Sequence, residues 1–307
     1  MNDSQKSGQI KELVLPNFII IGAARAGTVS LFNHLKEHPD VYLPYVKETD
    51  FFYKDYKKGL DYYRKTFYSG WKGEKAVGDI SPWYLSQPRV ANNIHEAIPG
   101  VQIIVTLRDP VERTFSDYRG RVGRGDEKRS FQEAIESQIA CIQKNDILAD
   151  GSVINYVDRS LYAKHLQPYL ELFQDIHFIL FEEFVADPLK TVQSLFELFG
   201  VDSDFTPSDL GTTFNTAHRQ PRSKILNRLL WDDNIKGKIK SVIPLPRNTL
   251  ISIRRFFSKL NDKMLPREKV PENGRQILTD FFKHDTEKLT ETLGNKIINK
   301  WNLYYNS

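Results

Sequence analysis

The chain has 307 residues, of which 40% are hydrophobic and 27% are charged, and its formal net charge is +4. This balance suits a globular enzyme whose ligands are anions, and the charge is too small for a general nucleic-acid binder, so we expect no nucleic-acid partner. The single cysteine, Cys141, excludes an internal disulfide and favours a reducing cytoplasm.

The N-terminal sequence predicts a flexible segment that precedes one large domain. Residues 1–14 are expected to be flexible and 15–307 to form a single domain, and 1–12 are polar without the apolar core of a signal peptide. No run approaches the roughly 18 apolar residues of a membrane span, so we expect no transmembrane segment.

Four short apolar runs predict strands, and a helical pattern follows each of them. Strands that alternate with helices indicate an α/β fold, with a P-loop-like parallel sheet flanked by helices. The expected strands are 17–21, 75–79, 101–107 and 177–181. The first expected helix begins at Thr28. Further helices are expected at about 85–98, 110–122, 130–144, 159–173 and 188–199.

The amino-acid composition of the chain changes beyond residue 223. We expect 223–307 to be a helical, basic extension of the same domain, with Gly294 ending its last helix. Within it, 224–260 mixes lysine and arginine with large apolar residues. That composition fits a peripheral contact with an anionic membrane, a lid over a lipid-like or acidic acceptor, or a solvated helical face.

A glycine-containing turn lies between the first strand and the first helix. In such a turn the backbone N–H groups converge and the helix dipole favours an anion. Gly22 and Gly27 allow the tight turn, while Arg25, Thr28 and Ser30 add donors. The alternative is a tight turn without a ligand, but the charge and the two hydroxyl groups favour a phosphate loop.

The spacing of Gly22 and Gly27 equals that of a Walker A loop, yet Thr28 stands where the lysine belongs. A nucleotide triphosphatase needs that lysine and magnesium to neutralise its phosphates. A sulfuryl group carries less charge, so its transfer needs no metal, and one cation such as Arg25 beside the bridging oxygen is enough. A P-loop kinase or NTPase and a non-catalytic nucleotide-binding protein remain as alternatives.

The segment 16–31 resembles the 5′-phosphosulfate loop of sulfotransferases that use 3′-phosphoadenosine-5′-phosphosulfate (PAPS), in particular bacterial members related to the heparan-sulfate sulfotransferases. That family usually has lysine in place of Arg25 and often threonine in place of Val29. The resemblance implies PAPS as donor without a metal, and a hydroxyl or amine of a carbohydrate, lipid-like molecule or small metabolite as acceptor. It assigns donor binding to Arg25, Ala26, Gly27, Thr28, Val29 and Ser30.

The segment 47–52, Lys-Glu-Thr-Asp-Phe-Phe, resembles the family segment that carries the general base. The resemblance implies that Glu48 takes the acceptor's proton while Arg25 serves the leaving oxygen. The alternative is that Glu48 pairs with Lys47 or another surface cation. Lys47 is also a candidate contact to the sulfate or to an anionic acceptor. The family's usual proline after the glutamate is Thr49 here.

Arg108 follows the third predicted strand, where ligands bind in open α/β sheets. With Asp109, Pro110 and Ser116 it resembles the family's 3′-phosphate motif, which implies that Arg108 and Ser116 hold that phosphate. Arg113 is expected to be structural and to pair with an acid.

Further segments resemble other parts of the family's site. Tyr162 is expected to reach the nucleotide or to pack in the core, and Arg219 and Arg222 are expected to clamp the 3′-phosphate. Near the acceptor we expect Asp79, Trp83 and Tyr84, of which the two aromatic residues either stack on the acceptor or pack.

Overall fold

The computed structural model describes residues 14–144, 155–210, 219–221, 223, 262–264, 268–294 and 301. These residues belong to two compact units. The first unit takes its residues from Met1–Arg108 and Tyr162–Thr213, and the second from Asp109–Leu161 and Phe214–Ser307. Within the described ranges, no helix is both long and apolar enough to cross a membrane.

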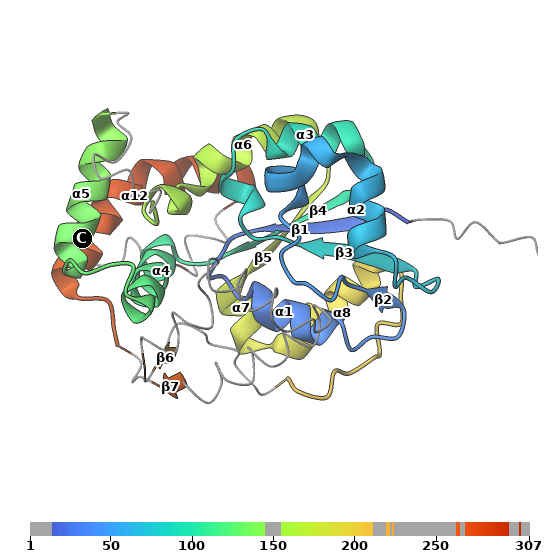
Figure 1. Cartoon of the computed structure of the whole chain (residues 1–307). Coiled ribbons are helices and arrows are strands. Elements are labelled where there is room, and N and C mark those ends of the chain that lie inside the picture. The colour runs from blue at the N-terminus through green and yellow to red at the C-terminus, as the bar shows by residue number, and fades with distance from the viewer. Residues whose placement is uncertain are drawn as a thin grey trace, which may run out of the picture. The chain divides into compact units, whose positions relative to one another are not determined.

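The first unit is built on a parallel sheet, which confirms the predicted fold class (Figure 1). In the described part of the unit, five strands follow the order β2-β3-β1-β4-β5. Their bounds are β1 (Phe18–Gly22), β2 (Val41–Tyr42), β3 (Ala76–Ile80), β4 (Gln102–Leu107) and β5 (Ile176–Leu180). The four predicted strands occur with ends shifted by at most one residue, whereas β2 is too short to give a sequence signal.

Helices cover both faces of this sheet (Figure 1). One face carries α1 (Thr28–Leu35), α7 (Phe181–Ala186) and α8 (Pro188–Phe199), and the other carries α3 (Val90–Ala97) and α6 (Tyr162–Leu172). Because both faces are covered, the strands read as continuous apolar runs, and every residue of β1 is buried. The remaining elements are α2 (Gly59–Phe67) and the short turns η1 (Phe51–Asp55), η2 (Tyr56–Lys58) and η3 (Tyr84–Ser86).

The strand order places a topological switch point beside β1. From β1 the chain visits β2 and β3 on one side and then crosses to β4 on the other. The loops that leave β1 and β4 therefore diverge at the carboxyl edge of the sheet. Ligands of open α/β sheets bind at such a point.

The second unit is mainly helical. It holds α4 (Pro110–Arg124), α5 (Phe131–Lys144), η4 (Asp158–Ser160), α12 (Glu272–Leu293) and the antiparallel pair β6 (Arg219–Pro221) and β7 (Asp262–Met264). The Asp109 carboxylate accepts the N–H groups of Val111 and Glu112, so α4 begins at Pro110 as predicted. Gly294, with φ of 79°, ends α12.

Arg113 is a structural residue of this unit. Its guanidinium is fully buried, its Nε donates to Ser160 Oγ at 2.6 Å, and its Nη1 lies 3.6 Å from Asp117 Oδ2. The expectation that Arg113 pairs with an acid is confirmed.

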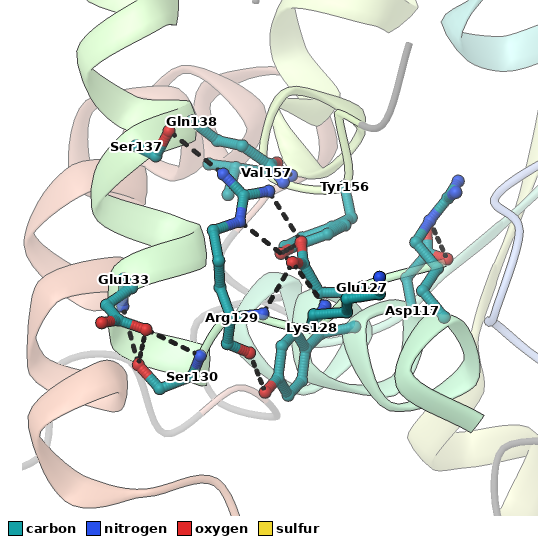
Figure 2. A network of polar contacts seen from close by, with 12 residues as sticks. Asp117, Glu127, Lys128, Arg129, Ser130, Glu133, Ser137, Gln138, Tyr156 and Val157 are labelled. Carbon is teal, nitrogen blue, oxygen red and sulfur yellow. Dashed lines mark hydrogen bonds and ion pairs between the residues drawn. The ribbon is translucent and has the colours of Figure 1, made fainter. Parts of the chain in front are cut away.

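A buried carboxylate connects the residues after α4 with the start of α5 (Figure 2). Glu127 accepts two hydrogen bonds from the Arg129 guanidinium, at 2.9 and 2.7 Å, and a third from Tyr156 at 3.1 Å. The Arg129 side-chain bonds, assisted by its backbone N–H and its charge, lower the pKa of Glu127 to about 2 although burial opposes them. The network therefore favours the ionised form of the Glu127 carboxylate.

Candidate active site

The turn between β1 and α1 is anchored to β4. Ala23 N donates to Thr106 O at 2.7 Å, and Thr106 Oγ1 donates to Gly22 O at 2.8 Å. Arg25 and Gly27 both adopt left-handed backbone conformations, with φ of 76° and 85°. These two positions turn the chain into α1.

The start of α1 has the form of an anion site. The first N–H groups of a helix have no partner within the helix, and Gly27 has no side chain to cap them. A Cβ atom at Gly27 would lie 3.0 Å from Phe181 Cδ2 and 3.1 Å from Phe184 Cδ1. A larger residue here would be strained by the left-handed conformation and would crowd the two phenylalanine rings.

Arg108 lies directly against this turn. Its Nη1 donates to Arg25 O at 3.2 Å, and its Cζ lies 4.8 Å from the centre of the Phe181 ring. Tyr162 is buried, and its hydroxyl donates to Arg108 O at 2.9 Å. Tyr162 thus supports the backbone of Arg108 from the core, which matches the second of its two expected placements.

Glu48 is held at the end of β3. Its backbone N–H donates to Ile80 O at 3.1 Å, and its φ of 69° is left-handed. Lys47 Nζ donates to Glu48 Oε1 at 2.7 Å, so the alternative pairing of Glu48 with Lys47 is present in this structure. The Glu48 side chain is 35% exposed, which keeps it within reach of a ligand.

The sheet brings these groups to one edge. Glu48 is fixed to the end of β3, the turn follows β1, and Arg108 follows β4. β3, β1 and β4 are adjacent and parallel, so their carboxyl ends are neighbours. A carboxylate, an anion-binding turn and an arginine therefore share the ligand-binding edge of the sheet.

Asp79 is placed differently from the expectation that it meets the acceptor, whereas Tyr84 packs, which is one of its two expected placements. Both are fully buried. Burial raises the pKa of Asp79, and hydrogen bonds to its carboxylate offset part of that effect. The donors are the hydroxyl groups of Thr49, Tyr63, Ser81 and Tyr84. Neither side chain is accessible to an acceptor in this structure, whereas Trp83 is partly exposed and stays a candidate.

Comparison with known proteins finds similarity to sulfotransferases. The profile of the sulfotransferase family matches residues 61–206, which include Arg108 and Tyr162. A crystal structure of a sulfotransferase from Alicyclobacillus acidocaldarius superposes with a TM-score of 0.64 and 27% identity, covering 91% of this chain and 96% of that one. The chain is thus similar to sulfotransferases in sequence and in fold.

Two curated sulfotransferases illustrate the range of the relatives. The membrane-associated sulfotransferase kil1 of Dictyostelium discoideum is 36% identical over 110 residues, which cover 35% of this chain and 23% of that protein. The heparan sulfate glucosamine 3-O-sulfotransferase 3B1 of Mus musculus is 31% identical over 189 residues, which cover 61% of this chain and 46% of that protein. The chain thus spans less than half the length of either relative.

Several residues that the sulfotransferase resemblance suggested belong to the second unit or lie outside the described ranges. Ser116 is buried on α4 of the second unit. Arg219 is described only as part of β6, and Arg222 and residues 224–260 lie outside the described part of the chain. Their roles stay predictions. Among the described residues, no group of three or more His, Cys, Asp or Glu side chains could hold a metal ion.

Two residues at this candidate site are not predicted from the sequence. Phe181 is predicted to end a strand but begins α7, where its ring packs against the Arg108 guanidinium and limits the space at Gly27. Thr49 stands out in the sequence only because it replaces the usual proline of the family. In the structure its hydroxyl donates to Asp79 Oδ2 at 2.6 Å.

Proposed function

We propose that this chain transfers the sulfuryl group of PAPS to a hydroxyl or amine of an acceptor. The supporting observation is the contact between the Arg108 guanidinium and the carbonyl oxygen of Arg25, which joins two anion-binding groups at the switch point of the sheet. The match of residues 61–206 to the sulfotransferase family profile supports this reaction.

The residues present fit an anionic donor. The N–H groups at the start of α1 follow Gly27, which has no side chain to cap them, and such groups suit an anion. In the proposal, Arg25 and the backbone N–H groups of Ala26, Gly27, Thr28, Val29 and Ser30 hold the phosphosulfate end, and Arg108 holds the 3′-phosphate. Ser116, Tyr162, Arg219 and Arg222 stay predictions for the same nucleotide.

Two side chains would perform the chemistry, for which PAPS supplies an activated sulfuryl group. Glu48 takes the proton of the acceptor hydroxyl on a carboxylate oxygen, as a positioned general base. Arg25 stabilises the negative charge that develops on the departing phosphate oxygen. Lys47, which is bonded to Glu48 Oε1, orients that carboxylate.

For the acceptor we favour a glycan over a lipid-like molecule or a small metabolite. The mouse relative is named for a glucosamine of heparan sulfate, which places sugar hydroxyl groups among the acceptors of similar proteins. The Dictyostelium relative is named membrane-associated, so a membrane surface stays a candidate partner for 224–260. The cytoplasmic compartment stays a prediction.

Calorimetric titration with 3′,5′-adenosine bisphosphate, compared with ATP and magnesium, tests the donor site. We expect binding of the bisphosphate that is weakened in Arg108→Ala. Tight binding of ATP with magnesium and none of the bisphosphate would instead indicate a P-loop NTPase.

A transfer assay then tests the reaction, with radiolabelled PAPS and a panel of glycan, lipid and small-molecule acceptors. We expect turnover to be lost in Glu48→Gln while bisphosphate binding is kept. Bisphosphate binding without transfer to any acceptor in the panel would favour a non-catalytic nucleotide-binding protein.

A further inference from the structure

The segment that carries Glu48 is attached to the end of β3 through a set of hydroxyl groups. The backbone N–H of Asp50 donates to Ser81 Oγ at 3.3 Å, that of Phe51 to Thr49 Oγ1 at 3.3 Å, and that of Phe52 to Tyr84 Oη at 3.2 Å. Three successive N–H groups thus end on three different hydroxyl oxygens. We call Thr49, Ser81 and Tyr84 the hydroxyl relay.

Every hydroxyl of the relay also donates to one carboxylate. Thr49 and Tyr84 donate to Asp79 Oδ2, at 2.6 and 3.1 Å, and Ser81 donates to Asp79 Oδ1 at 2.7 Å. A hydroxyl has one proton and two lone pairs. Because each hydroxyl directs its proton to Asp79, its lone pairs are turned toward the backbone N–H groups of 50–52.

Only a group that accepts without donating can organise the relay in this way. An ionised carboxylate accepts from all sides, whereas the amide of asparagine would present two N–H donors to hydroxyl groups that are themselves donating. Asp79 is fully buried and lies in β3 beside β1, so it is fixed by the sheet. The direction of the relay is therefore set by one immobile side chain.

The relay holds the segment around Glu48 in an unfavourable backbone conformation. Glu48 and Asp50 are both left-handed, with φ of 69° and 51°, and Thr49 lies between them. Side chains other than glycine disfavour this region, so surrounding contacts must maintain it. The contacts that hold it include the Glu48 N–H bond to Ile80 O, the relay itself and a hydrogen bond from Lys54 Nζ to Asp50 Oδ2 at 2.6 Å.

We propose that Asp79 is a positioning residue for the transfer reaction, because it orients the Thr49, Ser81 and Tyr84 hydroxyl groups that fix the turn bearing Glu48. The inference rests on the proposed function, in which Glu48 is the base. The precise placement of a base matters because a small displacement of reacting groups lowers the rate steeply.

The test uses one pair of variants at Thr49 and one matched control. Thr49→Val removes the relay hydroxyl but keeps the shape, and Thr49→Ser restores the hydroxyl. The control is Tyr63→Phe, since Tyr63 also donates to Asp79 Oδ2, at 2.7 Å, but accepts no N–H from 50–52 among the described contacts. Asp79→Asn completes the set if it folds, as judged by thermal unfolding.

We expect kcat to fall about 10- to 100-fold in Thr49→Val, with the KM for PAPS and bisphosphate binding unchanged. Thr49→Ser should recover most of kcat, and Tyr63→Phe should retain it. Amide hydrogen exchange should show lost protection at Phe51 in Thr49→Val and not in Tyr63→Phe.

Two results would overturn the proposal: wild-type kcat in Thr49→Val, or an equal loss of kcat in Tyr63→Phe. A wild-type chain that transfers sulfuryl to no acceptor would refute the proposed function instead. The exchange measurement separates the two cases, because it reports on the relay without any acceptor.

Discussion

The guanidinium of Arg108 donates a 3.2 Å hydrogen bond to the carbonyl oxygen of Arg25, which lies 83 positions earlier in the chain. The contact is a consequence of topology, since β1 and β4 are neighbours and both residues come after the carboxyl ends of these strands. One arginine thereby shapes the backbone of the phosphate loop as well as supplying positive charge. Substitution of Arg108 should therefore weaken binding of both the phosphosulfate end and the 3′-phosphate of the donor.

Arg108→Lys should weaken binding of 3′,5′-adenosine bisphosphate about 10-fold or more, because an ammonium cannot reproduce the planar fork of the guanidinium. It cannot contact Arg25 O and a phosphate with the same geometry. Calorimetry measures the effect, and Arg64→Lys on α2 is the matched control. Equal affinity in Arg108→Lys and wild type would contradict the role of the fork.

Gly27→Ala should lower the free energy of unfolding and abolish bisphosphate binding. The cost has two parts: about 1–2 kcal/mol for a left-handed non-glycine residue, and a further cost from crowding against Phe181 and Phe184. Gly125→Ala isolates the first part, because Gly125 has nearly the same φ, 84°, and nothing within 4 Å of an added Cβ. If chemical denaturation gives the two variants equal losses, the crowding at Gly27 is refuted.

Arg25→Gly should abolish turnover while changing the free energy of unfolding little. Arg25 has a φ of 76°, a conformation that glycine adopts readily, so the free energy of unfolding should stay within about 1 kcal/mol of wild type. Turnover should nevertheless be lost, because the cation beside the leaving oxygen is removed. Arg25→Lys should retain part of the turnover. An active Arg25→Gly enzyme would show that the loop backbone alone stabilises the transition state.

The strands and the glycine-containing turn after β1 could be predicted from the sequence for a physical reason. A parallel sheet covered on both faces yields apolar runs such as 18–22, and Gly27 supplies the left-handed conformation of the turn, where an added Cβ would crowd Phe181 and Phe184. Pro110 likewise marks the start of α4, because a helix tolerates proline in its first turn.

The surroundings of Glu48 could not be predicted in the same way. The hydroxyl relay forms only because residues near 49 and 79–84 meet at the end of β3, and no local pattern encodes that meeting. The family resemblance predicts Asp79 near the acceptor and leaves Tyr84 either to stack on the acceptor or to pack. In the structure both side chains are buried, and the Tyr84 hydroxyl donates to Asp79 Oδ2 at 3.1 Å.

The second unit should lose stability in acid through Glu127. Its pKa in the folded chain is lowered to about 2 from an ordinary 4.5, so its contribution is complete above pH 4.5 and is lost as the pH falls toward 2. The Glu127→Gln variant should therefore unfold more easily than wild type at pH 7, by about 3 kcal/mol. The difference between the two proteins should shrink between pH 4.5 and 2.

Urea denaturation at a series of pH values measures this dependence. Glu291→Gln, at an exposed position of α12, serves as a control that should stay close to wild type throughout. Because Arg129 and Tyr156 both bond to the Glu127 carboxylate, Arg129→Met should reduce the pH dependence in the same window. A constant difference between wild type and Glu127→Gln across the series would show that the carboxylate charge does not stabilise the network in Figure 2.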